Sequence, residues 1–96
     1  MLRVEWKKAA LNDRDRIARH IAECGGPQAA RKLDAEFVAK ARTAAQRPKL
    51  YRAGRMLGTH EIVVRPNYVM VYRVAGDAVI MLRVLHARQQ WPESNP

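Results

Sequence analysis

The last third of the chain constrains the fold most, because it contains three short apolar runs in close succession. The runs span His60–Arg65, Tyr68–Ala75 and Ala78–His86. They are rich in Val, Ile, Tyr and Met, which suit a pleated, half-buried surface. A Pro-Asn pair and a Gly-Asp pair separate the runs, and both pairs are typical of tight turns. We therefore predict an antiparallel three-stranded meander, which needs further structure packed on its apolar face.

The residues before the meander change from a strand period to a helical one. Leu2–Trp6 alternates apolar and charged residues, which predicts an added strand of the same sheet with Trp6 in the core. From about Lys8 the apolar residues follow a helical stripe that ends at Gly25-Gly26. The stripe contains Ala10, Ile17, Ile21 and Cys24, with Leu11, Ala18 and Ala22 beside it. The expected solvent face carries Lys8, Asp13, Arg16, Arg19 and Glu23.

A second helix is predicted from Pro27 to about Gln46. Proline suits the first position of a helix, and Pro48 prevents the helix from continuing. Its apolar stripe contains Ala30, Leu33, Phe37, Ala41 and Ala44. The two helices form an αα-hairpin, so the fold class is α+β: an N-terminal strand, an αα-hairpin and a three-stranded antiparallel meander. With 96 residues there is room for one core, which we assign to residues 1–92, with 93–96 as a frayed tail.

Composition restricts the class of protein and of partner. The apolar share of 48% is too high for a disordered chain, and the single cysteine, Cys24, cannot form an internal disulfide. No signal peptide or membrane span is evident, so we expect a cytoplasmic protein that does not enter the membrane. The net charge of +9 favours a polyanionic or acidic partner, although a basic solvated surface is the alternative.

Both alternating sets of the central and last strands are largely apolar. In Tyr68–Val74 and in Ala78–Leu85, few charged residues interrupt either set. A sheet with one solvent-exposed face shows a cleaner alternation of apolar and polar residues, and two helices cover only one face. We therefore expect another chain to cover the second face.

The connection from Lys49 to Gly58 is basic and has no clear period. Tyr51 lies among Lys49, Arg52 and Arg55, a combination that suits contact with nucleic acid. The alternative is an ordinary charged loop with Tyr51 packed at the edge of the core.

The order of elements and a set of short motifs resemble the RelE/ParE superfamily of bacterial toxins over residues 2–92. The motifs are EWKKAALNDRDRIARHIA near the start, then His60–Tyr68, Tyr72-Arg73-Val74, Val84–Arg88 and Pro92. The later motifs are most similar to the ParE branch. The resemblance implies a growth-inhibiting, plasmid-stabilising toxin of a type II toxin–antitoxin system. It also implies a hetero-oligomeric complex with a cognate antitoxin, acidic and ParD-like, whose extended segment neutralises the toxin.

The superfamily contains two activities, which imply different targets. ParE-like members poison DNA gyrase without cutting RNA, whereas RelE-like members cut messenger RNA in the ribosome without a metal. The RelE pattern has basic residues where this chain has Ile62-Val63-Val64, an arginine where it has Val69, and a tyrosine near the C-terminus, where none follows Trp91. Only Arg88 has a plausible RelE counterpart. The departures favour gyrase inhibition, with ribosome-dependent endoribonuclease activity as the alternative.

A different nuclease subset of the superfamily has a glutamate on the first meander strand, an arginine on the next and a histidine at the end of the last, and Glu61, Arg73 and His86 resemble that layout. Glu61 or His86 would act as base on a ribose 2′-hydroxyl, His86 as acid for the leaving oxygen, and Arg73 would bind the phosphate. Whether these side chains share a face depends on the strand register, because a slip of one residue separates them. We favour no catalytic residue. We also expect no cofactor and no metal, since the histidines and Cys24 lack the spacing of metal ligands.

The site residues that follow from this interpretation form two sets. The expected target-binding residues are Arg83, His86, Arg88 and Trp91. The expected antitoxin-binding residues are Tyr51, Arg52, Arg55, Val69, Val71 and Arg73.

Overall fold

The computed structural model describes residues 1–92, and its elements follow the predicted order. They are β1 (Arg3–Trp6), α1 (Lys8–Gly25), α2 (Pro27–Gln46), β2 (Arg52–Ala53), β3 (His60–Val64), β4 (Tyr68–Ala75) and β5 (Ala78–His86). The predicted α+β architecture is confirmed, and only the two-residue strand β2 was not expected. The tail that we expected to fray, 93–96, lies outside the described residues.

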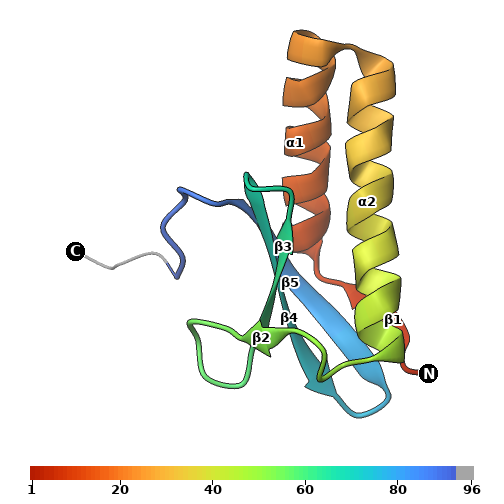
Figure 1. Ribbon diagram of the computed structural model, residues 1–96, viewed down its shortest axis with the longest axis vertical. Helices are drawn as coiled ribbons and strands as arrows, with labels where there is room; N and C mark the ends of the chain where they lie inside the picture. Colours follow the sequence, from red (N-terminus) through yellow and green to blue (C-terminus); the bar gives the residue numbers. More distant parts are fainter. Residues whose placement is uncertain (93–96) are drawn as a thin grey trace.

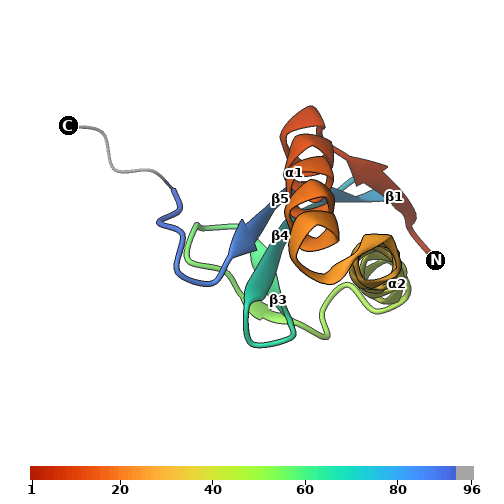
Figure 2. The ribbon, with the colours of Figure 1, turned by 90° about the horizontal axis from the view of Figure 1, so that it is seen from above.

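The strands form one sheet in the order β1-β5-β4-β3-β2 (Figure 1). β1 is parallel to β5, whereas the other neighbouring strands are antiparallel. The two helices form a hairpin on one side of the sheet, and its far end extends beyond the strands. Seen from above, the β2–β3 loop and the segment after β5 lie on the side away from the helices (Figure 2).

The core lies between the helical hairpin and one face of the sheet. Leu33 and Phe37 of α2 are buried against Tyr68, Met70 and Tyr72 of β4. The Phe37 and Tyr68 rings meet edge to face, with centroids 5.6 Å apart. Buried alanines on α2 allow close approach of the helix to the sheet; they are Ala30, Ala41, Ala44 and Ala45.

The second face of the sheet is largely buried by the chain itself. Val69 and Val71 of β4 are 6% and 0% exposed, and Ile80 and Leu85 of β5 are buried beside them. The expectation that another chain must cover this face does not hold for these side chains, because they are already inaccessible in the isolated chain. Val63 of β3, at 50% exposed, remains open.

Helix α1 packs Ala10, Ile17 and Ile21 of its expected apolar stripe on the core, but three other positions differ from the prediction. Asp13, assigned to the solvent face, is 1% exposed, whereas Cys24 of the expected stripe and Leu11, expected beside it, are exposed. Asp13 is buried because of the neighbouring strand. β1 pairs with β5 only as far as Met81, which leaves the later edge of β5 without a strand partner among the described residues. The Asp13 carboxylate takes that place by accepting a hydrogen bond from Val84 N–H at 2.9 Å.

Both predicted turns are confirmed, and each contains a residue with positive φ. Gly76 has φ 58° between the paired residues Ala75 and Ala78, a conformation that glycine adopts without steric cost. Arg65 has φ 55° in the turn after β3, and its guanidinium holds Glu36 of α2 with two hydrogen bonds of 2.8 and 3.0 Å. No helix among the described residues has the length and hydropathy that crossing a membrane requires.

Candidate functional site

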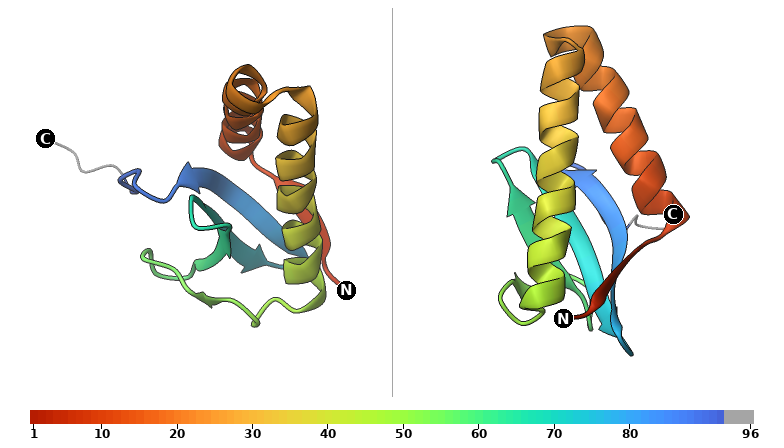
Figure 3. Two further views of the ribbon diagram at one scale, coloured as in Figure 1. Left: turned by 45° about the horizontal axis from the view of Figure 1, so that its top comes forward. Right: turned by 90° about the vertical axis from the view of Figure 1, so that its right-hand side faces the viewer.

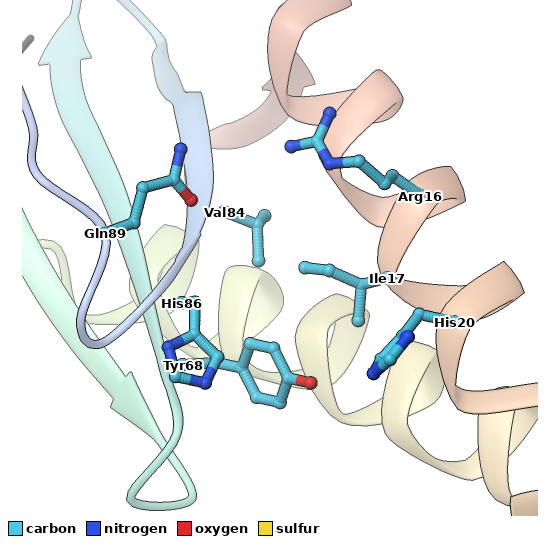
Figure 4. A pocket seen from close by; sticks show the side chains of 7 residues that line it. All are labelled: Arg16, Ile17, His20, Tyr68, Val84, His86 and Gln89. Carbon is cyan, nitrogen blue, oxygen red and sulfur yellow. The ribbon is translucent and has the colours of Figure 1, made fainter. Parts of the chain in front are cut away.

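A cleft of ≈ 170 Å³ lies between α1 and the adjoining ends of β4 and β5 (Figure 4). It gathers two imidazoles, a phenol, a guanidinium and a carboxamide over an aliphatic floor. The lining residues are Arg16, Ile17, His20, Tyr68, Val84, His86 and Gln89. None of them is a carboxylate, so the cleft suits an anionic or polar group better than a cation.

His86 enters this cleft through its pairing with Tyr68 across the last two strands. The two rings meet edge to face, with centroids 5.8 Å apart. His86 Nδ1 accepts a hydrogen bond from Arg88 N–H at 3.2 Å, so this nitrogen is unprotonated in the observed arrangement. The imidazole is therefore part of the turn that follows β5.

A buried carboxylate fixes the wall of the cleft. Asp13 accepts hydrogen bonds from Arg83 Nε at 2.7 Å, from Arg83 Nη2 at 3.0 Å and from Arg16 Nη2 at 2.7 Å. Burial raises the pKa of Asp13, but the hydrogen bonds from Arg83, Val84 N–H and Arg16 outweigh it and lower the pKa below its ordinary value. Asp13 is thus ionised at neutral pH and links α1 to β5.

A second buried carboxylate, Glu61, lies on the other face of the sheet. It accepts hydrogen bonds from Arg55 N–H at 2.8 Å and Arg55 Nε at 2.9 Å, and from Arg52 at 3.4 Å. The hydrogen bonds from Arg55 lower its pKa and outweigh the effect of burial. Arg55 also donates to the Trp91 carbonyl oxygen at 3.4 Å, so one guanidinium joins β3 to the segment after β5.

Tyr72 and His60 hold the beginning of the basic connection against the core. The Tyr72 hydroxyl donates to the Pro48 carbonyl oxygen at 2.7 Å, and burial raises the pKa of Tyr72 to about 12. The His60 ring stacks on Tyr72 with centroids 5.0 Å apart. Its Nδ1 lies 3.1 Å from the Tyr51 carbonyl oxygen, which only accepts, so Nδ1 carries the proton.

The structure does not bring Glu61, Arg73 and His86 together. Glu61 pairs with Val71 and Arg73 with Ile80, which places both on the face away from the helices. His86 pairs with Tyr68 on the helix-facing side. A bulge in β5 causes this separation. The register passes from Tyr72–Met81 to Val71–Arg83, which leaves Leu82 as an extra residue. The side chains of β5 after Leu82 therefore point to the opposite face from the one that strict alternation would give them.

The expected target-binding residues occupy different environments. The Arg83 side chain is 22% exposed and bound to Asp13, whereas His86 lines the cleft. Arg88 is exposed and Trp91 is half-buried in the segment after β5.

The expected antitoxin-binding residues also occupy different environments, some buried and some exposed. Val69 and Val71 are buried, and Arg73 is half-buried. Tyr51 packs edge to face on Tyr72, with centroids 6.4 Å apart, which matches the ordinary-loop alternative for this tyrosine. Arg52 and Arg55 are exposed at their outer ends while they bind Glu61.

Several residues of these sites were not expected from the sequence. Arg16, His20 and Tyr68 join His86 in the cleft, and Asp13 accepts a hydrogen bond from Arg16. The spacing of Arg16 and His20, one turn apart on α1, was the available signal, but it did not show which way the helix faced. Among residues 1–92, no three His, Cys, Asp or Glu side chains lie close enough to hold a metal ion together.

Comparison with known proteins finds matches over nearly the whole chain. A family model described as the ParE toxin of the type II toxin–antitoxin system parDE matches residues 4–91. A Sinorhizobium fredii (strain NBRC 101917 / NGR234) protein named "Putative toxin Y4kP" is 36% identical over 92 residues, which cover 95% of this chain and 94% of that protein.

Two solved structures show the same fold at low sequence identity. A chain from the chromosomal ParDE toxin–antitoxin system of P. aeruginosa superposes with a TM-score of 0.81 and 24% identity, over 90% of this chain and 96% of that one. The isolated E. coli RelE toxin superposes with a TM-score of 0.65 and 16% identity, over 95% of this chain and 89% of that one. The fold is therefore common to ParE-type and RelE-type toxins.

Proposed function

This chain belongs to the ParE toxin family of type II toxin–antitoxin systems, and we propose that it arrests growth by binding and inhibiting DNA gyrase. In this proposal the toxin acts as a protein ligand and performs no chemistry of its own. Its contact with gyrase includes the exposed guanidinium of Arg88 and the indole of Trp91, both in the segment after β5. Arginine and tryptophan commonly carry much of the binding energy of protein interfaces.

The observation that carries the proposal is the separation of Glu61 from His86 on opposite faces of the sheet. A nuclease needs its base and its acid within hydrogen-bond reach of one substrate. Glu61 is also 4% exposed and saturated by Arg55, and its lowered pKa makes it a weak base. The arrangement of these residues supports binding over RNA cleavage.

A second candidate function, ribosome-dependent endoribonuclease activity, is favoured by one observation. The cleft beside α1 brings His20, Tyr68 and His86 together with Arg16. Imidazole and phenol groups transfer protons, and a guanidinium stabilises a charged phosphate in the transition state. In this alternative the RNA backbone enters the cleft and no metal takes part.

We also propose that an acidic antitoxin neutralises the toxin in a hetero-oligomeric complex. Membership of a toxin–antitoxin family supports a protein partner, and the net charge of +9 supports an acidic one. Complementary charge accelerates association more than it deepens affinity.

A gyrase assay with purified toxin and a message-cleavage assay in expressing cells, whose growth is followed, test the proposed target. DNA gyrase supercoiling is measured with increasing toxin, and primer extension is run on messages from cells that express it. Gyrase inhibition with intact messages is the expected result. Cleaved messages with unaffected supercoiling would contradict the gyrase proposal and favour the cleft nuclease. Growth without arrest would contradict both.

A further inference from the structure

The connection between α2 and β3 carries three exposed apolar side chains. Leu50 is 50% exposed, Met56 is 40% exposed and Leu57 is 103% exposed, so Leu57 touches almost nothing in the chain. We call residues 47–58 the 47–58 segment. It runs along one end of the sheet and projects from the side away from the helices (Figure 3). Single exposed leucines are ordinary, but three large apolar side chains within eight residues indicate a contact surface.

The 47–58 segment is held in one shape by hydrogen bonds at its beginning, middle and end. Near its start, the Tyr72 hydroxyl binds the Pro48 carbonyl oxygen. Around its tip, Arg55 binds the buried Glu61, and the Thr59 hydroxyl donates to the Met56 carbonyl oxygen at 2.6 Å. A preorganised loop loses less conformational entropy on binding than a flexible one, so its exposed side chains contribute more to affinity.

The charge of the 47–58 segment has a single sign. It contains Arg47, Lys49, Arg52 and Arg55 and no Asp or Glu. The Glu61 carboxylate neutralises the charge of Arg55 and, at 3.4 Å, part of the charge of Arg52. Arg47, Lys49 and the outer part of Arg52 remain exposed beside the apolar side chains.

The apolar side chains favour a protein as the occupant over a nucleic acid. Single-stranded nucleic acid stacks on aromatic rings, but the aromatic ring of this segment, Tyr51, is packed against Tyr72. The exposed groups are aliphatic, and methionine and other apolar side chains with cations around them are typical of protein interfaces. The matching partner has carboxylates around an apolar patch.

We propose that the 47–58 segment is a docking surface for the antitoxin, with Leu57 and Met56 as apolar anchors and Arg47, Lys49 and Arg52 as contacts for its carboxylates. This inference rests on the antitoxin pairing proposed above and specifies where on the toxin that pairing occurs. Charge complementarity decides the occupant: the segment is wholly cationic, and an acidic antitoxin supplies the opposite charge.

Binding of the purified protein encoded by the reading frame adjacent to the toxin gene tests the inference by titration calorimetry. Leu57→Ser is compared with Leu11→Ser, a matched control at a leucine 46% exposed on α1. We expect Leu57→Ser to raise Kd about tenfold or more and Leu11→Ser to change it less than about twofold, because anchors at the centre of an interface dominate affinity. We also expect hydrogen exchange of residues 50–58 to slow in the wild-type complex.

The outcomes separate this inference from the function on which it rests. If wild-type toxin does not bind the adjacent gene product, the antitoxin pairing itself fails. If wild type binds and Leu57→Ser binds equally well, with no added protection at residues 50–58, the docking surface is wrong and the pairing stands. If Leu57→Ser keeps antitoxin affinity but loses gyrase inhibition, or loses binding to phosphatidylserine vesicles, the surface serves the target or a membrane and the inference is overturned.

Discussion

Arg83 binds Asp13 through two hydrogen bonds, with Nε 2.7 Å from Oδ2 and Nη2 3.0 Å from Oδ1. The pair joins the last strand to the first helix across 70 positions of sequence. The Asp13 side chain is 2% exposed and the Arg83 side chain 22%, so water weakens the interaction only partly. The same carboxylate binds the Val84 N–H that β1 leaves unpaired.

Asp13→Asn should therefore destabilise the fold. The amide cannot satisfy Arg83, Arg16 and Val84 N–H together, and it leaves a guanidinium without its counter-charge. We expect a loss of about 2–4 kcal/mol in the free energy of unfolding, measured by urea denaturation. Asp15→Asn, at a carboxylate 67% exposed on the same helix, serves as the control and should change it by less than about 0.5 kcal/mol. Equal losses in the two variants would show that the buried hydrogen bonds of Asp13 contribute no more to the free energy of unfolding than an exposed carboxylate does.

Acid should destabilise the protein through the two buried carboxylates. Folding lowers the pKa of Glu61 from 4.5 and that of Asp13 from 3.8, so the unfolded chain binds more protons than the folded chain at low pH. Their contribution is complete above the unfolded values and is lost as pH falls through the folded ones. We expect the free energy of unfolding to be level from pH 7 to about 5 and to fall below about pH 4.5, by urea denaturation at each pH.

Glu61→Gln tests the assignment of this acid sensitivity. The variant should be less stable than wild type at neutral pH, and its free energy of unfolding should fall less between pH 5 and 3. An acid dependence identical to that of wild type would mean that other groups are responsible.

Gly54→Ala should distort the 47–58 segment, because a Cβ at this position would collide with the Thr59 hydroxyl and lie 3.2 Å from Thr59 Cβ. We expect a loss of about 1–3 kcal/mol in the free energy of unfolding. Gly25→Ala is the matched control, since its Cβ would meet only Ala29 Cβ at 3.4 Å. Thermal denaturation followed by circular dichroism compares the two; a loss confined to Gly25→Ala would contradict the predicted crowding.

His86→Gln should remain toxic if the protein binds gyrase instead of cutting RNA. Glutamine keeps a polar side chain of similar reach but does not titrate near neutral pH, and loss of a contact at the rim of an interface usually costs little affinity. Loss of a general acid or base costs roughly 100- to 10,000-fold in rate, enough to abolish growth arrest by a nuclease. The measurement is growth after induction of the toxin in cells that lack the antitoxin.

Arg88→Ala and Trp91→Ala provide the complementary variants. If they fold as wild type by circular dichroism, we expect growth arrest to be incomplete, because each removes a contact to the target. A folded, harmless His86→Gln beside a fully toxic Arg88→Ala would lead us to abandon the gyrase proposal in favour of the nuclease.

The sequence by itself determined the order, type and approximate bounds of the main elements. Hydrophobic period and turn residues are local signals, so the meander from His60 to His86 and the helix from Pro27 to Gln46 were readable without knowledge of their neighbours. The two-residue strand β2 carries no period and exists only because Arg52 and Ala53 pair with β3.

Only the tertiary structure decided which functional side chains meet. One extra residue in β5, Leu82, turns Val84 and His86 toward the helices and away from Glu61 and Arg73. Such a bulge depends on pairing between strands and leaves no local pattern in the sequence. The burial of Asp13 likewise depends on a distant N–H of β5 that needs an acceptor, so a residue that is polar by sequence becomes part of the interior.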